Sequence, residues 1–219
     1  MQSIGIFGGT FDPVHSGHLA LACQVRDRFA LDQLLIVPAL EPPHKRQPVA
    51  TFTHRVAMLD AALQDCPDCA RICCSRIEQS LSRPSYTIHT VEAVLRSCAP
   101  CHTALVIGMD SLADLPNWYR VEDLLARVDL VAVNRGQTSP ATIREFVMRL
   151  QPRYQPMPTH NNAWINHAGR TLTLLPDFHQ PFSSTAIRQA LGRGEEAVGL
   201  SEAVRTYIHA HRLYSHSSS

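Results

Sequence analysis

The sequence predicts an α/β fold built on a doubly wound, mainly parallel sheet. Residues 34–38 form a wholly apolar run of strand length, as expected of a strand buried on both faces, and residues 103–107 and 129–133 are apolar after their first residue. Segments with helical periodicity separate these runs. Glycine turns follow residues 4–7 and 103–107, and each turn leads into a predicted helix. Together these features indicate strand–turn–helix units that repeat along the chain.

The length and charge of the chain limit the class of protein. A chain of 219 residues suits one domain that buries about 70% of its unfolded surface. A formal charge of +1 does not predict the broad basic surface that binds nucleic acid. No segment reaches the roughly 20 apolar residues of a membrane span, and no basic segment precedes the first apolar run. We therefore expect a cytoplasmic protein without a nucleic-acid or membrane partner, either a monomer or a homodimer.

The predicted elements follow in a regular order. Strands are expected at residues 4–7, 34–38, 71–77, 103–107, 129–133 and 170–176. Helices are expected at residues 19–30, 53–64, 87–98, 143–150 and 201–211, with another beginning near residue 183. The strand order 3-2-1-4-5, plus the sixth strand, opens a crevice where strands one and four end.

The predicted domain has three parts. The sheet occupies about residues 1–176, a small helical part occupies residues 177–214, and residues 215–219 form a disordered tail. Residues 137–171 are rich in Pro, Asn, His and Gln beyond one helical stretch, so we expect a surface excursion there.

The stretch from Gly8 to His18 has the features of a phosphate-binding loop. Gly8 and Gly9 let the backbone approach a ligand, and the following helix directs its N-terminal donors to the same place. His15 and His18 are three residues apart, so both imidazoles lie on one helix face. A helix cap and a packed ring are the alternative roles for these two histidines.

A second candidate anion site begins the helix near residue 183. Ser183, Ser184 and Thr185 could serve only as helix caps. Arg188, one turn later, adds a forked cation to the same helix end. His44 and Lys45, in a loop after the second strand, are further candidate anion contacts, although a solvated loop is an equal alternative.

Seven cysteines include two C-x-x-C pairs, at Cys66 and Cys69 and at Cys98 and Cys101, with Cys73, Cys74 and His102 nearby. The two pairs together could form a zinc site. In the expected strand order, however, they lie about 14 Å apart, too far for one ion. We therefore expect reduced, structural thiols and no metal site.

Several motifs resemble those of the nucleotidyltransferase superfamily. They are GGTFDPVHSGH, PPHK, PSYT, IGMDS, LPNW and SSTAIR, in that order. Over about residues 4–214 the whole pattern resembles bacterial nicotinate-nucleotide adenylyltransferases. That resemblance implies a Rossmann-like fold and a reaction of ATP with nicotinate mononucleotide that gives deamido-NAD and pyrophosphate, with Mg²⁺ bound through the ATP phosphates.

The resemblance also implies a role for each motif. His15 and His18 would hold ATP phosphates beside Thr10 and the backbone of Gly8 and Gly9. The remaining implied ATP contacts are Gly108, Asp110, Arg135, Ser184, Thr185 and Arg188. The implied mononucleotide contacts are His44, Lys45, Tyr86, Thr87 and Trp118. Of all these, His15, His18, Lys45 and Arg188 would be catalytic. His89 departs from the family, which usually has an acidic residue there, and so does Phe182, where a branched aliphatic residue is common.

The site chemistry leaves alternatives open. No P-loop lysine or nucleophile–base pair is recognisable in the sequence. A 5′-phosphate needs neither, because it is largely a dianion at neutral pH. Adenylyltransferases of nicotinamide mononucleotide or phosphopantetheine, a cytidylyltransferase, and a regulator that binds nucleotide without turnover are the competing readings.

Overall fold

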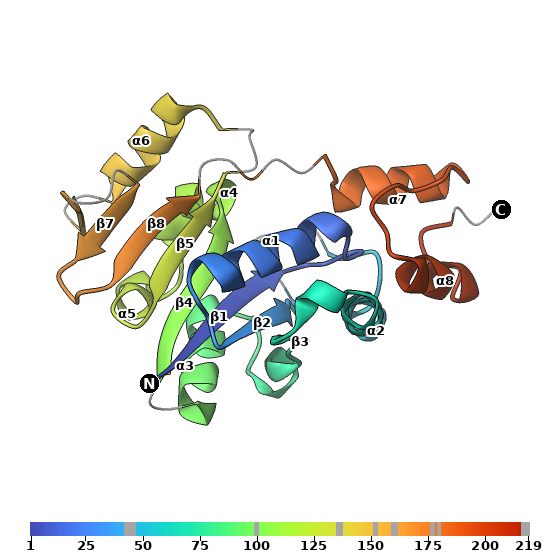
Figure 1. Ribbon diagram of the computed structural model, residues 1–219, viewed down its shortest axis with the longest axis horizontal. Helices are drawn as coiled ribbons and strands as arrows, with labels where there is room; N and C mark the ends of the chain where they lie inside the picture. Colours follow the sequence, from blue (N-terminus) through green and yellow to red (C-terminus); the bar gives the residue numbers. More distant parts are fainter. Residues whose placement is uncertain are drawn as a thin grey trace. The chain divides into compact units, whose positions relative to one another are not determined.

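The described residues of the computed structural model form one eight-stranded sheet (Figure 1). They are residues 1–41, 47–98, 101–134, 138–150, 153–158, 162–175, 178 and 181–215. The strands are β1 Gln2–Gly9, β2 Gln33–Pro38, β3 Ile72–Cys74, β4 Cys101–Gly108, β5 Asp129–Val133, β6 Tyr154–Pro156, β7 Ala163–Asn166 and β8 Thr171–Leu175. Their order, β3-β2-β1-β4-β5-β8-β7-β6, confirms the predicted 3-2-1-4-5 arrangement.

The chain divides into two compact units. The first comprises Met1–Gly8 and Tyr86–His179, and the second comprises Gly9–Ser85 and Gln180–Ser219. Helices of the first unit are α3 Thr87–Ser97, α4 Met109–Asp114, the 3₁₀ turn η3 Leu115–Asn117, α5 Val121–Leu125 and α6 Pro140–Arg149. Helices of the second unit are α1 Ser16–Arg28, α2 Phe52–Gln64, the 3₁₀ turns η1 Pro67–Cys69 and η2 Ile77–Ser80, α7 Ser184–Gly192 and α8 Glu202–Ala210.

In the first unit, four parallel strands are buried on both faces. β4 pairs with β1 and β5, and β5 pairs with β8. Ile6 of β1 and its partner Leu105 of β4 are buried on one face, and the next pair, Phe7 and Val106, is buried on the other. This two-sided burial is why these strands read as continuous apolar runs.

The expectation of a surface excursion over residues 137–171 is wrong. The predicted helix is present as α6, but β6 and β7 then extend the sheet in the antiparallel direction beyond β8. β6 contains only three residues and includes Pro156, and β7 contains only four. Strands this short show no measurable alternation, so the pairing of β7 with β8 and of β6 with β7, rather than local sequence, defines them.

In the second unit, helix α8 packs against α2, as Figure 1 shows. Val204 and Ile208 supply the buried face of α8, and the Asp65 carboxylate accepts a hydrogen bond from the backbone N–H of Ala203, near the start of α8. The expected helical part after residue 176 is thus present as α7 and α8. The third strand is shorter than predicted: β3 ends at Cys74, and η2 occupies the end of the expected 71–77 run.

Within the described part of the chain, no helix has both the length and the apolar character that crossing a membrane requires.

Candidate functional site

His15 and His18 lie at the start of α1 with their rings stacked. The ring centroids are 3.7 Å apart and the ring planes differ by 25°. His15 is the extended residue that precedes the helix, and His18 completes the first turn. Both are nearly buried, with exposed fractions of 5% and 9%, and the Phe11 ring packs edge-on against His18 at 5.0 Å. The predicted placement of both imidazoles on one face is therefore correct.

One hydrogen bond engages Nδ1 of His18. Its Nδ1 accepts from the backbone N–H of His15 at 3.2 Å. The imidazole tautomer that accepts at Nδ1 carries its hydrogen at Nε2. The bond thus fulfils the capping alternative and, at the same time, prepares Nε2–H as a donor.

The start of α1 is also held by the C-terminal part of the chain. The backbone N–H of Ser16 donates to the carbonyl of Gly199 at 2.8 Å, so this first helical donor is already paired. Gly199 has a φ of +94°, and a Cβ there would lie 2.6 Å from the ring of Phe182. The donors that α1 can direct at a ligand are therefore those after Ser16.

Asp12 is the hub of the loop and was not singled out by sequence reasoning. Its side chain is nearly buried and accepts from the backbone N–H groups of Val49 at 2.7 Å and Ala50 at 3.1 Å. The phenol of Tyr214 donates to the same carboxylate at 2.6 Å. Asp12 therefore connects the loop after β1 to the segment before α2 and to the C-terminal end of the chain.

Arg55 of α2 is a second residue that sequence reasoning missed. It is only 1% exposed, and its Nη1 donates to the carbonyl of Thr10 at 2.8 Å. Burial lowers the pKa of its guanidinium, while the nearby Asp12 carboxylate opposes that shift. The sequence signal was a charged residue directly beside Val56 on the buried face of α2. Arg55 therefore holds the backbone of the loop after β1 at Thr10.

Helix α7 places the second set of predicted residues against the same loop. Ser183 caps the helix by accepting from the N–H of Ala186, which confirms the capping alternative for this residue. Ser184 Oγ donates to the carbonyl of Pro13 at 2.9 Å. Arg188 donates to the carbonyl of Asp12 at 2.5 Å and to Thr185 Oγ1 at 3.3 Å. The start of α7 and the loop that leads to α1 are consequently joined by direct hydrogen bonds.

The Tyr214 phenol makes the stability of the folded protein depend on pH. Burial, together with its hydrogen bond to Asp12, raises the pKa of Tyr214 above its usual value near 10. Above pH 10 the unfolded chain loses this proton while the folded chain keeps it, so stability falls as pH rises. We expect Tyr214→Phe to lessen this fall by up to about 1.4 kcal/mol per pH unit. Urea unfolding at pH 8 to 11 would measure it, and equal pH slopes for the two proteins would contradict it.

In the first unit, Gly108 and Asp110 lie close together in the turn after β4. A Cβ at Gly108 would lie 2.5 Å from Oδ1 of Asp110. Gly108 precedes α4, and Asp110 lies in the first turn of that helix. The predicted pair is therefore adjacent in space, with the carboxylate folded back over the glycine.

Three rings gather near the start of α3 in the same unit. Tyr86 stacks on Tyr119 with centroids 4.5 Å apart, and His89 meets both rings edge-on at 5.8 Å. Among the described residues, His89 Nδ1 is a buried atom without a hydrogen-bond partner. Tyr86 precedes α3 but makes no capping bond with its side chain, and α3 begins at Thr87. The ring that stacks on Tyr86 is thus Tyr119, which was not a predicted contact. The predicted Trp118 is partly buried at the end of η3.

Three predicted residues, His44, Lys45 and Arg135, lie outside the described residues.

The cysteines differ from expectation in one pair. Cys66 and Cys69 form a disulfide, so the expectation that these two thiols are reduced is wrong. Cys98 and Cys101 are free. Within the C-x-x-C turn of η1 the two α-carbons are only 5.3 Å apart, which is a normal separation for such a bond.

Comparison with known proteins agrees with this geometry. The cytidylyltransferase-like family model matches residues 6–190. A protein of Laribacter hongkongensis, named as a probable nicotinate-nucleotide adenylyltransferase, is 37% identical over 99% of this chain and 96% of its own length. One of the same name from Pseudomonas aeruginosa is 34% identical over 97% of both chains.

Solved structures agree on the fold. Nicotinic acid mononucleotide adenylyltransferase of Plasmodium falciparum, complexed with NaAD, superposes with a TM-score of 0.73 at 16% identity, covering 98% of each chain. The same enzyme complexed with APC gives a TM-score of 0.70 at 17% identity, again over 98% of both chains. From the family model and the full-length relatives together, the chain belongs to the nicotinate-nucleotide adenylyltransferases of the cytidylyltransferase-like family.

Proposed function

We propose that this protein transfers the adenylyl group of ATP to nicotinate mononucleotide, giving deamido-NAD and pyrophosphate in NAD biosynthesis. The observation that carries the proposal is the joining of two helix starts by one loop. Arg188 and Ser184 at the start of α7 bond the carbonyls of Asp12 and Pro13, the residues that lead into His15 and α1. Two adjacent helix starts rich in donors suit a polyphosphate.

The starts of α1 and α7 hold the triphosphate in this proposal. His18 offers Nε2–H because its Nδ1 is engaged by the His15 backbone. Thr185 and Arg188 supply a hydroxyl and a guanidinium from α7, and Ser184, whose hydroxyl donates to Pro13, contributes its backbone N–H. His15, Thr10 and the backbone of Gly8 and Gly9 complete the contacts. Gly108 and Asp110 contact the adenosine ribose, and Arg135 closes over the nucleotide.

The chemistry requires positioning and charge neutralisation. An oxygen of the mononucleotide 5′-phosphate attacks the α-phosphorus of ATP, and the bond from that phosphorus to the oxygen bridging to the β-phosphate breaks, releasing pyrophosphate. The attacking phosphate needs no base, because it is mostly a dianion at pH 7. Neutral donors and Arg188 then stabilise charge that spreads onto the leaving group. We assign Lys45 and His44 to phosphate contacts on the mononucleotide side.

A divalent metal accompanies the nucleotide in nucleotidyltransferases generally, and we propose Mg²⁺ here. Mg²⁺ keeps several waters and binds mainly through substrate phosphates. We therefore treat it as part of the ATP substrate. It would neutralise phosphate charge, while His18 and Arg188 orient the same phosphates.

Specificity for the acid rests on the start of α3. The backbone N–H groups in the first turn of a helix lack intrahelical acceptors, and Tyr86 does not cap them with its side chain. We propose that those near Thr87 receive the nicotinate carboxylate, with the pyridine ring against Tyr86 and Trp118. The carboxamide of nicotinamide mononucleotide in this place would turn its NH₂ group, a donor, toward a backbone N–H, which is also a donor.

We expect the acid to be preferred over nicotinamide mononucleotide. One unpaired donor costs about 1–3 kcal/mol, which corresponds to roughly 5–150-fold in kcat/KM. Pyrophosphate release with ATP and Mg²⁺ would be measured in parallel for nicotinate mononucleotide, nicotinamide mononucleotide and phosphopantetheine. Equal efficiencies for acid and amide would contradict the carboxylate pocket. ATP binding without turnover of any acceptor would identify a regulator instead.

A cytoplasmic location, a monomeric or homodimeric state and a single nucleotidyltransferase domain remain predictions from the sequence.

A further inference from the structure

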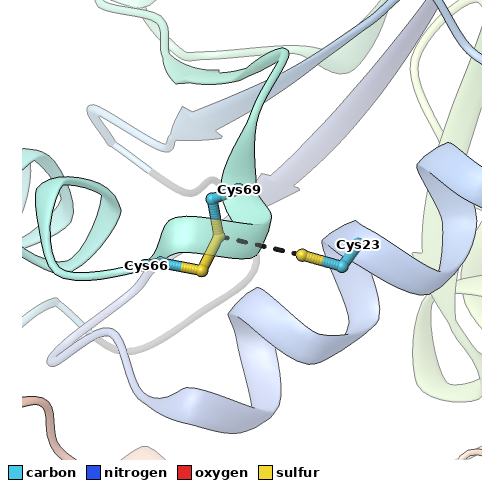
Figure 2. Close-up of side chains that lie close together, drawn as sticks. All are labelled: Cys23, Cys66 and Cys69. Atoms are coloured by element: carbon cyan, nitrogen blue, oxygen red, sulfur yellow. Dashed lines mark hydrogen bonds between the residues drawn. A yellow bond between two sulfur atoms is a disulfide. The ribbon is translucent and has the colours of Figure 1, made fainter.

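Three sulfur atoms converge on one edge of the second unit, apart from the residues assigned to the nucleotides. Cys23 lies on α1, Cys66 precedes the η1 turn and Cys69 ends it. Figure 2 shows the three side chains together. Their sulfurs all lie within 4.8 Å of one another, and those of Cys23 and Cys69 are 3.7 Å apart. Among the described residues, this is the only cluster of three or more side chains of metal-ligating type.

The spacing of these sulfurs matches a thiolate metal site. With Zn–S bonds of about 2.3 Å, two ligands of a tetrahedral zinc lie about 3.8 Å apart. The contact between Cys23 and Cys69 already has this separation. A C-x-x-C turn commonly supplies two of the ligands of a zinc site, and three protein ligands with a water in the fourth position make an open tetrahedral site.

Arg26 holds the two elements together independently of the sulfurs. It lies one turn after Cys23 on α1, is only 7% exposed, and its Nη1 donates to the carbonyls of Asp68 at 2.6 Å and Ala70 at 2.7 Å. Asp27 accepts from the same guanidinium at 2.7 and 2.9 Å. The η1 turn is therefore fixed against α1 whether or not Cys66 and Cys69 are bonded.

We propose that, when its thiols are reduced, the protein binds one Zn²⁺ ion through Cys23, Cys66 and Cys69. Reduction adds two electrons and two protons to the Cys66–Cys69 disulfide, taken from a dithiol that itself becomes a disulfide. Zn²⁺ then forms three Zn–S bonds as the three thiols release three protons, and a water occupies the fourth position. The ion would join α1, the helix that begins at His15, to the segment that follows α2.

Thiol exchange is the competing use of this cluster. Exchange would move a disulfide bond among the same three sulfurs, and its product, a mixed disulfide of Cys23, distinguishes it from metal binding. The three sulfurs all lie within 4.8 Å of one another, which fits a shared metal ion.

Cobalt binding tests the proposal in the full-length protein. After reduction with a dithiol and its anaerobic removal, Co²⁺ is added and the near-ultraviolet charge-transfer band of thiolate-bound cobalt is followed. We expect saturation at one equivalent and displacement by Zn²⁺. Zinc at about 100 times its Kd should also raise the Tm by roughly 5–10 °C.

Matched variants separate this site from other thiols. Cys23→Ser changes one atom and should weaken metal binding by more than the roughly 10–100-fold expected for loss of an outer-shell partner. Cys98→Ser alters the other C-x-x-C pair and should leave affinity and stoichiometry unchanged. Absence of the band in the reduced protein would overturn the proposal, as would an equal band in Cys23→Ser. A mixed disulfide of Cys23 without metal uptake would show the exchange role instead.

Discussion

His18→Ala is expected to lower kcat by roughly 10²–10³-fold, the usual loss when one preorganised donor to a charged transition state is removed. The KM for ATP should change far less, because charge grows on the phosphates only as the reaction proceeds. The reason lies in the His15–His18 pair. Since Nδ1 of His18 accepts from the His15 backbone, we assign the contact with the phosphates to Nε2–H. Steady-state kinetics with ATP and nicotinate mononucleotide would measure the effect.

Two further variants separate the catalytic hydrogen from the structural bond. In His18→Asn the amide oxygen takes the place of Nδ1, so the bond from the His15 N–H is kept while Nε2–H is lost. In His18→Gln an amide N–H reaches the place of Nε2. We expect the asparagine variant to fold normally and to be as slow as the alanine variant, and the glutamine variant to recover part of kcat. Full activity in His18→Asn would show that Nε2–H is not used.

The sequence predicted those parts of the fold that have strong local signals. The apolar runs of β4 and β5 and the helical spacing of α2 were recognisable because burial on both faces, or on one helix face, leaves a regular pattern. β6 and β7 left no such pattern. β7 pairs with the edge of β8 and β6 pairs with β7, and three or four residues suffice for each pairing.

In the candidate site, too, local features were predictable from the sequence and long-range contacts were not. The spacing of His15 and His18 predicted a shared face, since helical geometry alone brings them together. The role of Asp12 depends on partners that are 37, 38 and 202 residues away in sequence, at Val49, Ala50 and Tyr214. The approach of Cys23 to Cys69 likewise spans 46 residues. Contacts at such distances have no spacing rule, so only the folded chain reveals them.

Asp12→Ala is expected to lower the free energy of unfolding by about 3–5 kcal/mol, as when one member of a buried charged network is removed. The carboxylate is 3% exposed and accepts three hydrogen bonds, so its loss leaves three donors without their acceptor. For a protein whose total stability is of the order of 5–15 kcal/mol, this is a large fraction. Urea unfolding with an unchanged m-value would measure it as a shift in midpoint.

Tyr214→Phe is the matched control because it removes a single donor from the same carboxylate. The loss should be about 1 kcal/mol, as for one ordinary hydrogen bond. Asp12→Asn keeps the shape and one acceptor oxygen and should lie between the two, so it preserves the comparison if the alanine variant does not fold. In the double variant of Asp12→Ala and Tyr214→Phe the losses should not add, because both remove the same hydrogen bond. Equal losses for Asp12→Ala and Tyr214→Phe would mean that the backbone of Val49 and Ala50 finds other acceptors, and that Asp12 is not the hub of the loop.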